Sequence, residues 1–147
     1  TQNELAKLLN TAKISGCSEH IHVLGKLDDN ELSIAYAAST VLAFPALDIP
    51  GDVEGFGMVA VEAAAHGTPT VAFSVGGIPD AVADGISGRL IPSGNYAEFA
   101  DAIIDYLEKP PDIHGHESCR TFARYFVWPR FGERLRDNLK ELIPKLR

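Results

Sequence analysis

Short apolar segments rich in β-branched residues alternate with segments of helical periodicity along most of this chain. The apolar segments predict strands at residues 21–24, 41–44, 70–73 and 89–91. Strands joined through helices run parallel, because a connection between parallel strands has to cross over one face of the sheet. Helices then bury both faces of that sheet. The alternation therefore predicts an α/β fold, a doubly wound, Rossmann-like parallel sheet with helices on both faces.

Helical periodicity and end signals place the connecting helices. They are expected at residues 3–14, 28–38, 58–66, 78–84, 95–109, 118–125 and 129–146. Gly67 is suited to end the third helix, since glycine readily adopts the left-handed conformation found beyond helix ends. Asn95 and Glu98 fit an N-cap and its partner three residues on. No predicted strand follows the last two helices, so they do not belong to the alternation of strands and helices. We expect one Rossmann-like domain over residues 1–127, with residues 128–147 as its C-terminal helix.

Charge and cysteine usage exclude several classes of protein. The 147 residues carry a formal net charge of −7, which disfavours nucleic-acid binding because that function needs a basic face. No apolar run approaches the roughly 18 residues of a membrane span, and no targeting segment is visible. Cys17 and Cys119 form no CxxC pair and are expected to be reduced thiols. We therefore expect a cytoplasmic protein, with membrane-peripheral attachment left open.

The loop after the second predicted strand has the most pronounced ligand-binding pattern. Ligands of doubly wound sheets bind where strands end, and this loop leads through Gly55-Phe56-Gly57 into a helix. Glycine allows close approach of a ligand, and the first amides of a helix lack partners within it. A phosphate placed there would accept those N–H groups and gain from the helix dipole. A plain tight turn before a helix is the alternative.

Two carboxylates accompany this turn. Glu54 precedes it and can face the same cleft, whereas Glu62 lies within the following, almost wholly apolar helix. A buried carboxylate needs hydrogen-bond donors, and the vicinal hydroxyls of a ribose would provide them. The alternatives are a salt bridge or cap within the protein for Glu62, and a solvated loop position for Glu54.

A second glycine pair, Gly76-Gly77, follows the third predicted strand. Together with Ser74 it could approach the same ligand from the next strand end. The alternative is a turn between that strand and a short helix.

The histidines form no metal-binding pattern. His20 and His22 alternate on a predicted strand, and His114 and His116 lie in a loop rich in proline and glycine. Neither pair has a cysteine or a third ligand at a suitable spacing, so no metal is expected.

Several segments together resemble a known family. The stretch 52–63 is similar to the Glu-x7-Glu motif of retaining GT-B glycosyltransferases, within the large family that includes sucrose synthases and bacterial mannosyltransferases. Further segments that agree in order and separation are 64–71, 76–80 and 84–91. The resemblance spans about residues 5–145, and the longer loop before Glu54 is similar to phosphatidylinositol mannosyltransferases. It implies the C-terminal, donor-binding domain of a glycosyltransferase of this type.

The resemblance also implies a role for each motif residue. Glu54 would act in catalysis by contacting the transferred sugar, and Glu62 would hold the ribose. The residues that would line the diphosphate and sugar, mainly through backbone N–H groups, are Phe56, Gly57, Met58 and Val59. Gly25 would lie beside the nucleotide base. The donor would be a nucleoside diphosphate sugar, bound without an essential metal because basic side chains and helix dipoles stabilise the leaving diphosphate.

The resemblance further implies parts that this chain lacks. Such domains begin with a strand, a helix and a second strand that carry an Arg and a Lys for the leaving diphosphate, and this chain is expected to begin after them. The N-terminal, acceptor-binding half is expected to be absent too. We therefore expect that the chain alone transfers no sugar at a useful rate. We also expect that exposed apolar surface near Trp128 favours self-association or an altered position of the C-terminal helix. Asp80 stands where the family more often has Glu.

Three functions stay open at this point. The first is retaining transfer of a hexose from a nucleoside diphosphate sugar to a lipid, polysaccharide or small glycoside. The second is a non-catalytic sugar-nucleotide-binding module, and the third is a sugar-nucleotide epimerase of GT-B architecture. The spacing of Glu54 and Glu62 around Gly-Phe-Gly favours the transferase.

Overall fold

The structure, a computed structural model, describes residues 2–47 and 55–142 and divides into two units. The first unit is Thr1–Glu31 and the second is Leu32–Arg147. The first unit contains helix α1 (Gln2–Ile14), a short 3-10 helix η1 (Ser18–His20) and the first residues of helix α2 (Asp29–Ala38). Both α-helices agree with the sequence prediction to within a residue.

The strand predicted at residues 21–24 is not formed. Ile21 has an extended backbone, but within the described residues this segment pairs with no neighbouring strand. Val23 and Leu24 are 52% and 64% exposed. Apolar, β-branched residues favour a strand only where a ladder partner and a covering layer exist, and this segment has neither.

The second unit contains a three-stranded parallel sheet. Its strands are β1 (Leu42–Phe44), β2 (Thr70–Phe73) and β3 (Gly88–Ile91), in the order β1-β2-β3. The central strand β2 is buried along its whole length, as expected for a strand covered on both faces. All three strands lie where the sequence predicts them.

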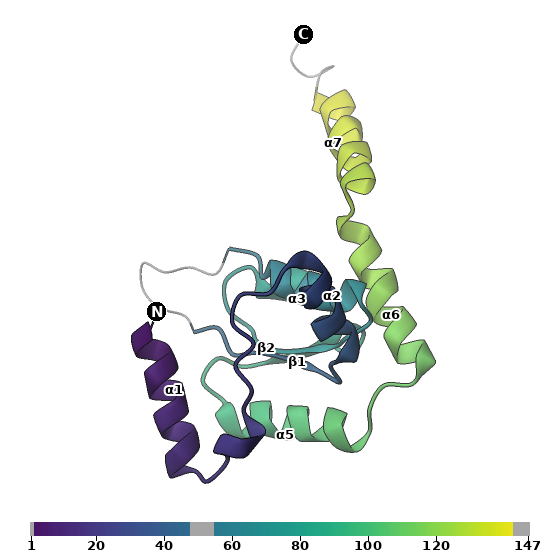
Figure 1. Ribbon diagram of the computed structural model, residues 1–147. Helices are drawn as coiled ribbons and strands as arrows, with labels where there is room; N and C mark the ends of the chain where they lie inside the picture. Colours follow the sequence, from purple (N-terminus) through teal and green to yellow (C-terminus); the bar gives the residue numbers. More distant parts are fainter. Residues whose placement is uncertain (1, 48–54, 143–147) are drawn as a thin grey trace. The chain divides into compact units, whose positions relative to one another are not determined.

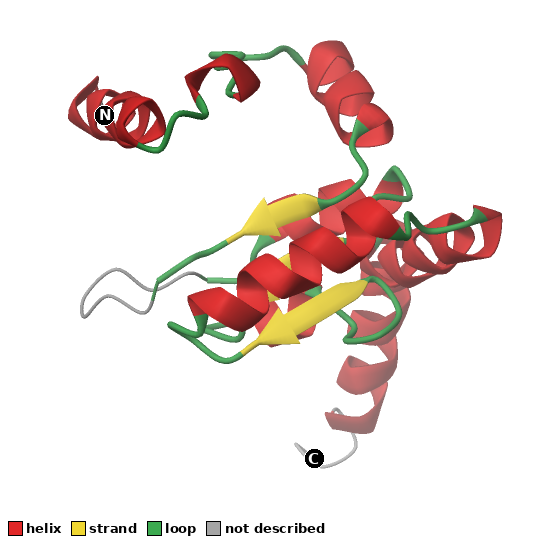
Figure 2. Ribbon diagram, turned by 90° about the horizontal axis from the view of Figure 1, so that it is seen from below, coloured by secondary structure: helices red, strands yellow, loops and turns green. Residues whose placement is uncertain are grey.

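Helices cover both faces of this sheet. Helix α3 (Met58–Ala65) lies on one face and α5 (Tyr96–Glu108) on the other, as Figures 1 and 2 show. The short helix α4 (Ile78–Ala81) connects β2 to β3 and ends three residues before the predicted boundary. The core lies between these layers and centres on Val71, Phe73, Ile78, Val82, Ile91 and Phe99. The predicted Rossmann-like α/β fold is confirmed.

Helix caps agree with the local signals in the sequence. The Glu98 backbone N–H donates to Asn95 Oδ1 at 3.3 Å, and Asn95 Nδ2 donates to Glu98 Oε2 at 2.7 Å. This reciprocal bonding starts α5 at the predicted N-cap. Helix α6 (Ile113–Ala123) begins five residues earlier than predicted, because the Asp112 carboxylate accepts from the Gly115 N–H at 2.9 Å.

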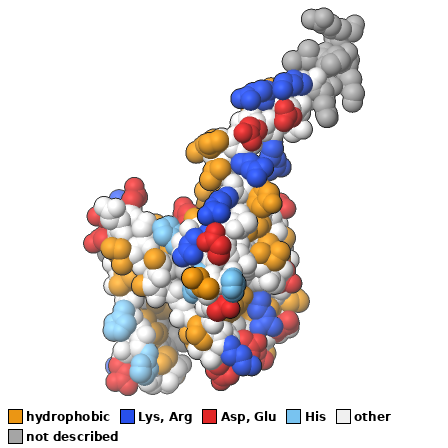
Figure 3. All heavy atoms as spheres, turned by 90° about the vertical axis from the view of Figure 1, so that its right-hand side faces the viewer, with side chains coloured by type: hydrophobic (Ala, Val, Ile, Leu, Met, Phe, Trp, Pro, Cys, Tyr) orange, Lys and Arg blue, Asp and Glu red, His pale blue; other side chains and the backbone are white. Residues whose placement is uncertain are grey.

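The last helix that the structure describes is amphipathic. Helix α7 (Trp128–Leu142) follows α6 through a 3-10 turn, η2 (Arg124–Phe126). Its apolar side chains recur every three or four positions and are largely exposed: Trp128 at 82%, Phe131 at 54%, and Leu135 and Leu139 at 47% each. Figure 3 shows apolar and basic side chains side by side along α6 and α7. Among the helices described, none has the length and apolar character to cross a membrane.

Candidate functional site

The glycine turn before α3 is sterically required. Gly57 is the N-cap of α3 and has φ 80° and ψ 47°, a left-handed conformation that favours glycine. A Cβ at this position would lie 3.1 Å from the ring of Phe44 and 3.4 Å from Ile78. The turn is therefore held between the end of β1 and the start of α4, at the carboxyl edge of the sheet.

The second glycine pair lies directly against this turn. A Cβ on Gly77 would overlap the carbonyl group of Gly55 and lie 3.1 Å from Cα of Phe56. Gly77 has no left-handed φ, so close backbone approach alone explains its missing side chain. The structure thus brings together the two glycine motifs that follow adjacent strands.

The Glu62 carboxylate has a partner within the protein. Glu62 is half-buried on α3, and the Tyr36 hydroxyl of α2 donates to its Oε2 at 3.1 Å. Tyr36 is 9% exposed. Burial, reinforced by the hydrogen bond to Glu62 and the charge of Glu62, raises the pKa of Tyr36 to about 12. This partner is a phenol, so the contact is a hydrogen bond and differs from the salt bridge or cap weighed from the sequence.

His66 and Thr68 extend this contact into a network. His66 Nδ1 lies 2.8 Å from the backbone carbonyl of Glu62; since a carbonyl only accepts, Nδ1 carries the proton. His66 Nε2 faces the Ser33 hydroxyl at 3.1 Å, and its ring stacks on Tyr36 with centroids 5.6 Å apart. Thr68 donates from Oγ1 to the Tyr36 carbonyl at 2.6 Å. Sequence reasoning missed Tyr36, whose helical spacing indicated only an apolar face.

A cavity of about 440 Å³ opens beside Glu62. It is lined by three residues of the predicted site, namely Phe56, Met58 and Glu62. The other lining residues are Val61, Ala65, Ala123, Tyr125, Phe126, Val127, Trp128, Phe131 and Arg134. Among these described lining side chains only Glu62 and Arg134 are charged, so the carboxylate faces a largely apolar space.

The remaining predicted residues lie elsewhere or are not described. Glu54 falls outside the described residues. Val59 is in the first turn of α3, is 38% exposed and does not belong to the described lining of this cavity. Gly25 is an exposed residue of the first unit with φ 72°.

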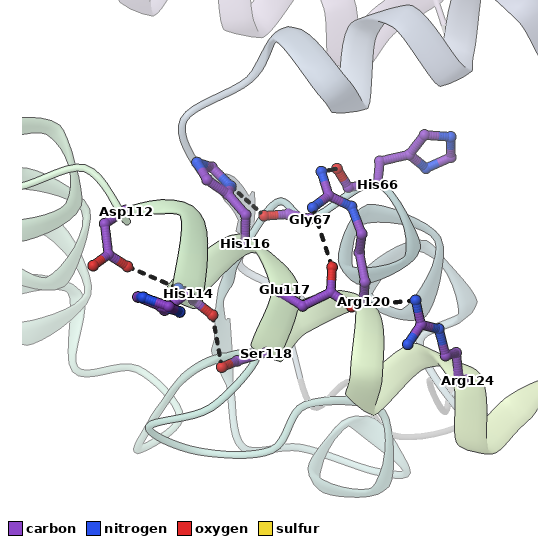
Figure 4. Close-up of polar contacts among 10 residues, drawn as sticks. His66, Gly67, Asp112, His114, His116, Glu117, Ser118, Arg120 and Arg124 are labelled. Carbon is purple, nitrogen blue, oxygen red and sulfur yellow. Dashed lines mark hydrogen bonds and ion pairs between the residues drawn. The ribbon is translucent and has the colours of Figure 1, made fainter.

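Two basic side chains of α6 hold the C-terminal end of α3 (Figure 4). His116 Nδ1 donates to the carbonyl of Gly67 at 2.8 Å, and Arg120 donates to the carbonyl of His66 at 3.3 Å. The last carbonyls of a helix lack partners within it and carry partial negative charge. These contacts therefore satisfy the end of the helix that carries Glu62.

The histidines near this end are engaged in structural contacts. His116 uses Nδ1 for the Gly67 carbonyl, and Asp112 caps α6. Within residues 2–47 and 55–142, no group of three or more His, Cys, Asp and Glu side chains is arranged to hold a metal ion.

Known structures share this architecture. Sucrose-phosphate synthase from Thermosynechococcus elongatus superimposes with a TM-score of 0.77 and 25% identity, over 97% of this chain and 35% of its own. The Anabaena protein Alr3699/HepE, solved in complex with UDP, superimposes with a TM-score of 0.71 over 95% of this chain and 37% of its own. At 23% identity, the second likeness shows the fold alone. The fold is that of a C-terminal GT-B domain.

Sequence relatives define the family. Residues 1–125 match the family described as glycosyl transferases group 1, and the chain belongs to this family. The D-inositol 3-phosphate glycosyltransferase of Mycolicibacterium smegmatis is 37% identical over 121 residues, which are 82% of this chain and 26% of the relative. The protein of the same name from Corynebacterium aurimucosum is 36% identical over 129 residues, 87% of this chain and 30% of the relative. The chain thus spans between a quarter and a third of these relatives.

Proposed function

We propose that this chain is the donor-binding part of a retaining glycosyltransferase that moves a hexose from a nucleoside diphosphate sugar to an acceptor. One observation carries the proposal. The Glu62 carboxylate, held by Tyr36, lines a cavity together with Phe56 and Met58 at the start of α3. A carboxylate beside a helix N-terminus matches the two polar parts of a nucleoside diphosphate, the vicinal ribose hydroxyls and the phosphates.

The proposed binding mode follows from this arrangement. The diphosphate would accept N–H groups from the first turn of α3, where the amides of Met58 and Val59 lack partners within the helix. Glu62 would accept hydrogen bonds from the ribose. For Gly25, the resemblance to the family, rather than this arrangement, suggests a role beside the base. Glu54 would contact the transferred sugar. No essential metal is needed in this mode, because dipoles and basic side chains stabilise the leaving diphosphate.

Further parts of the enzyme would come from outside this chain. Since the chain spans 26% to 30% of the relatives, we propose that the acceptor half and the basic pair for the diphosphate lie in the remainder. Loss of such charge stabilisation raises a reaction barrier by about 3 kcal/mol or more. The chain alone is therefore expected to bind a donor without transferring sugar. A cytoplasmic location and peripheral membrane contact of the whole enzyme stay predictions.

The relatives suggest which acceptor to test first. Both are named D-inositol 3-phosphate glycosyltransferases, so we propose D-inositol 3-phosphate as the first acceptor for the full-length enzyme. Lipid, polysaccharide and small glycoside acceptors form the comparison set. The donor base and sugar stay open, so GDP-mannose, UDP-glucose and UDP-N-acetylglucosamine are the donors to compare.

Calorimetric titration tests the proposal directly. We expect this chain to bind at least one of UDP, GDP and their sugars, and Glu62→Ala to weaken that binding by about tenfold or more. Glu108→Ala removes an exposed carboxylate of α5, on the opposite face of the sheet, and serves as the matched control. Equal affinity of wild type and Glu62→Ala would remove the ribose role.

Activity of the full-length protein separates the alternatives. The proposed transferase would form a glycoside only when an acceptor is present, and the product would keep the anomeric configuration of the donor. An epimerase would convert one sugar nucleotide into another without an acceptor, and a binding module would do neither.

A further inference from the structure

We propose that Tyr36 is a positioning residue of the donor site, whose hydroxyl fixes the Glu62 carboxylate in the orientation that accepts the ribose hydroxyls. This inference rests on the function proposed above. It adds a residue from α2 to a site that the sequence motif confines to the α3 region.

The hydrogen bond leaves the carboxylate free to bind a ligand. A carboxylate offers about four lone-pair sites. Tyr36 Oη donates to Oε2 of Glu62 at 3.1 Å and so uses one of them. Oε1 and the second lone pair of Oε2 are enough for two vicinal hydroxyls. Because a glutamate side chain has several rotatable bonds, fixing it in advance removes an entropy cost that binding would otherwise carry.

Tyr36 is itself rigidly held. Its side chain is buried, at 9% exposed, and its backbone carbonyl accepts from Thr68 Oγ1 at 2.6 Å. Its ring stacks on His66 with an interplanar angle of 29°. A donor held by its backbone and its ring can define the orientation of a neighbouring carboxylate.

His66 ties the same assembly to the backbone of Glu62. Nδ1 of His66 donates to the Glu62 carbonyl at 2.8 Å, and Nε2 meets the Ser33 hydroxyl at 3.1 Å. The stacked pair Tyr36 and His66 thus contacts Glu62 at both its side chain and its main chain. The ring against which Tyr36 stacks is thus bonded to the backbone of α3 and to Ser33 of α2.

A purely structural tie between α2 and α3 is the competing explanation. Such a tie would change the stability of the protein and affect every ligand alike. A positioning role instead changes the ability to distinguish a ribose from a sugar without its hydroxyls. The ratio of the two affinities therefore separates the explanations.

The experiment compares UDP and GDP with their 2′,3′-dideoxy counterparts by calorimetry on this chain. Wild type is expected to prefer the ribose form by about tenfold or more, and Tyr36→Phe to lose most of that preference. Asn95→Ala removes the N-cap of α5, on the opposite face of the sheet, so it should lower the melting temperature and leave the ratio unchanged. Tyr106→Phe removes the hydroxyl of a half-buried tyrosine on α5 and should change neither.

Three results would overturn the proposal. If Tyr36→Phe loses equal affinity for the ribose and dideoxy forms, Tyr36 only ties α2 to α3 and does not position the carboxylate. If wild type binds the nucleotides without preferring the ribose form, neither Glu62 nor Tyr36 recognises the ribose. The proposed donor site would remain, because the nucleotides still bind. Absence of any nucleoside diphosphate binding overturns the proposed function as well.

A measurement on wild type covers the case in which Tyr36→Phe does not fold. The ¹³C resonance of the Tyr36 ring carbon that bears the hydroxyl reports on its hydrogen bond to Glu62. We expect the ribose form of the nucleotide to shift this resonance and the dideoxy form to leave it in place. Equal shifts with both forms, or none with either, contradict the positioning role.

Discussion

The Tyr36 hydroxyl donates a 3.1 Å hydrogen bond to the Glu62 carboxylate, across 26 positions of the chain. The bond joins α2 to the helix that carries the proposed ribose-binding group. Because it pairs a phenol with a carboxylate, it also couples the folded state to the protonation of Tyr36.

Stability should fall steeply at alkaline pH. Burial and Glu62 raise the pKa of Tyr36 to about 12, whereas the unfolded chain keeps the ordinary value of 10.0. The neutral phenol therefore stabilises the folded state fully below pH 10, and this stabilisation is lost as the pH rises towards 12. We expect at most about 3 kcal/mol of such loss. Urea unfolding between pH 9 and 12 measures it, and Tyr36→Phe should show a shallower decline.

Two glycine substitutions should differ in their effect on ligand binding. An alanine at Gly77 would press its Cβ into the Gly55 carbonyl, so the backbone beside the start of α3 has to move. An alanine at Gly94 meets nothing within 4 Å and carries only the strain of φ 79°. We expect Gly77→Ala to weaken UDP or GDP binding by about tenfold or more. Gly94→Ala should lower the melting temperature without weakening binding, and similar calorimetric affinities for the two variants would contradict this.

One buried hydroxyl should be dispensable. Thr70 on β2 is fully buried, and within the part of the chain that is described its Oγ1 has no hydrogen-bond partner. Thr70→Val keeps the shape and removes the desolvation cost, so unfolding should require about 1 kcal/mol more free energy. Thr68→Val is the matched control: its Oγ1 donates to Tyr36 at 2.6 Å, and its loss should destabilise by a similar amount. Chemical denaturation of both variants checks that the free energy of unfolding rises in Thr70→Val and falls in Thr68→Val.

The exposed face of α7 should promote self-association. Trp128 and Phe131 are 82% and 54% exposed, and an apolar stripe of this kind normally meets a partner. We expect light scattering at increasing concentration to report a mass above the 15.8 kDa of one chain. The double substitution Trp128→Ser, Phe131→Ser should restore that mass. Ile113→Ser, at a position 76% exposed on α6, controls for loss of a single apolar side chain, and a wild-type monomer would refute the prediction.

The sequence predicts best where the signal is local. Strand β2 is assigned to the residue because its β-branched and apolar residues, Thr70 to Phe73, form one short run whose four side chains are all buried. Asn95 and Gly67 are recognised as helix-end residues because their chemistry acts within one turn. The strand predicted at residues 21–24 is wrong because a strand also needs a neighbouring strand to pair with. Periodicity along the chain does not reveal whether such a partner exists.

In the candidate site, too, the sequence identifies residues that lie close together in the chain and misses those that are distant. The glycines around Phe56 and the carboxylate of Glu62 are found because they belong to one short motif. Tyr36 lies 26 positions away, and its helical spacing resembles that of any core residue. Only the packing of α2 against α3 reveals that its hydroxyl reaches a carboxylate.

The contacts at the end of α3 bear on how small a donor-binding domain can be. The donors to Gly67 and His66 come from His116 and Arg120, 49 and 54 positions further along the chain. A chain shortened after α5 would retain every residue of the Glu-x7-Glu motif, yet it would leave these two carbonyls without their partners. We therefore expect a version of this domain that ends before Arg120 to be less stable than one that includes α6.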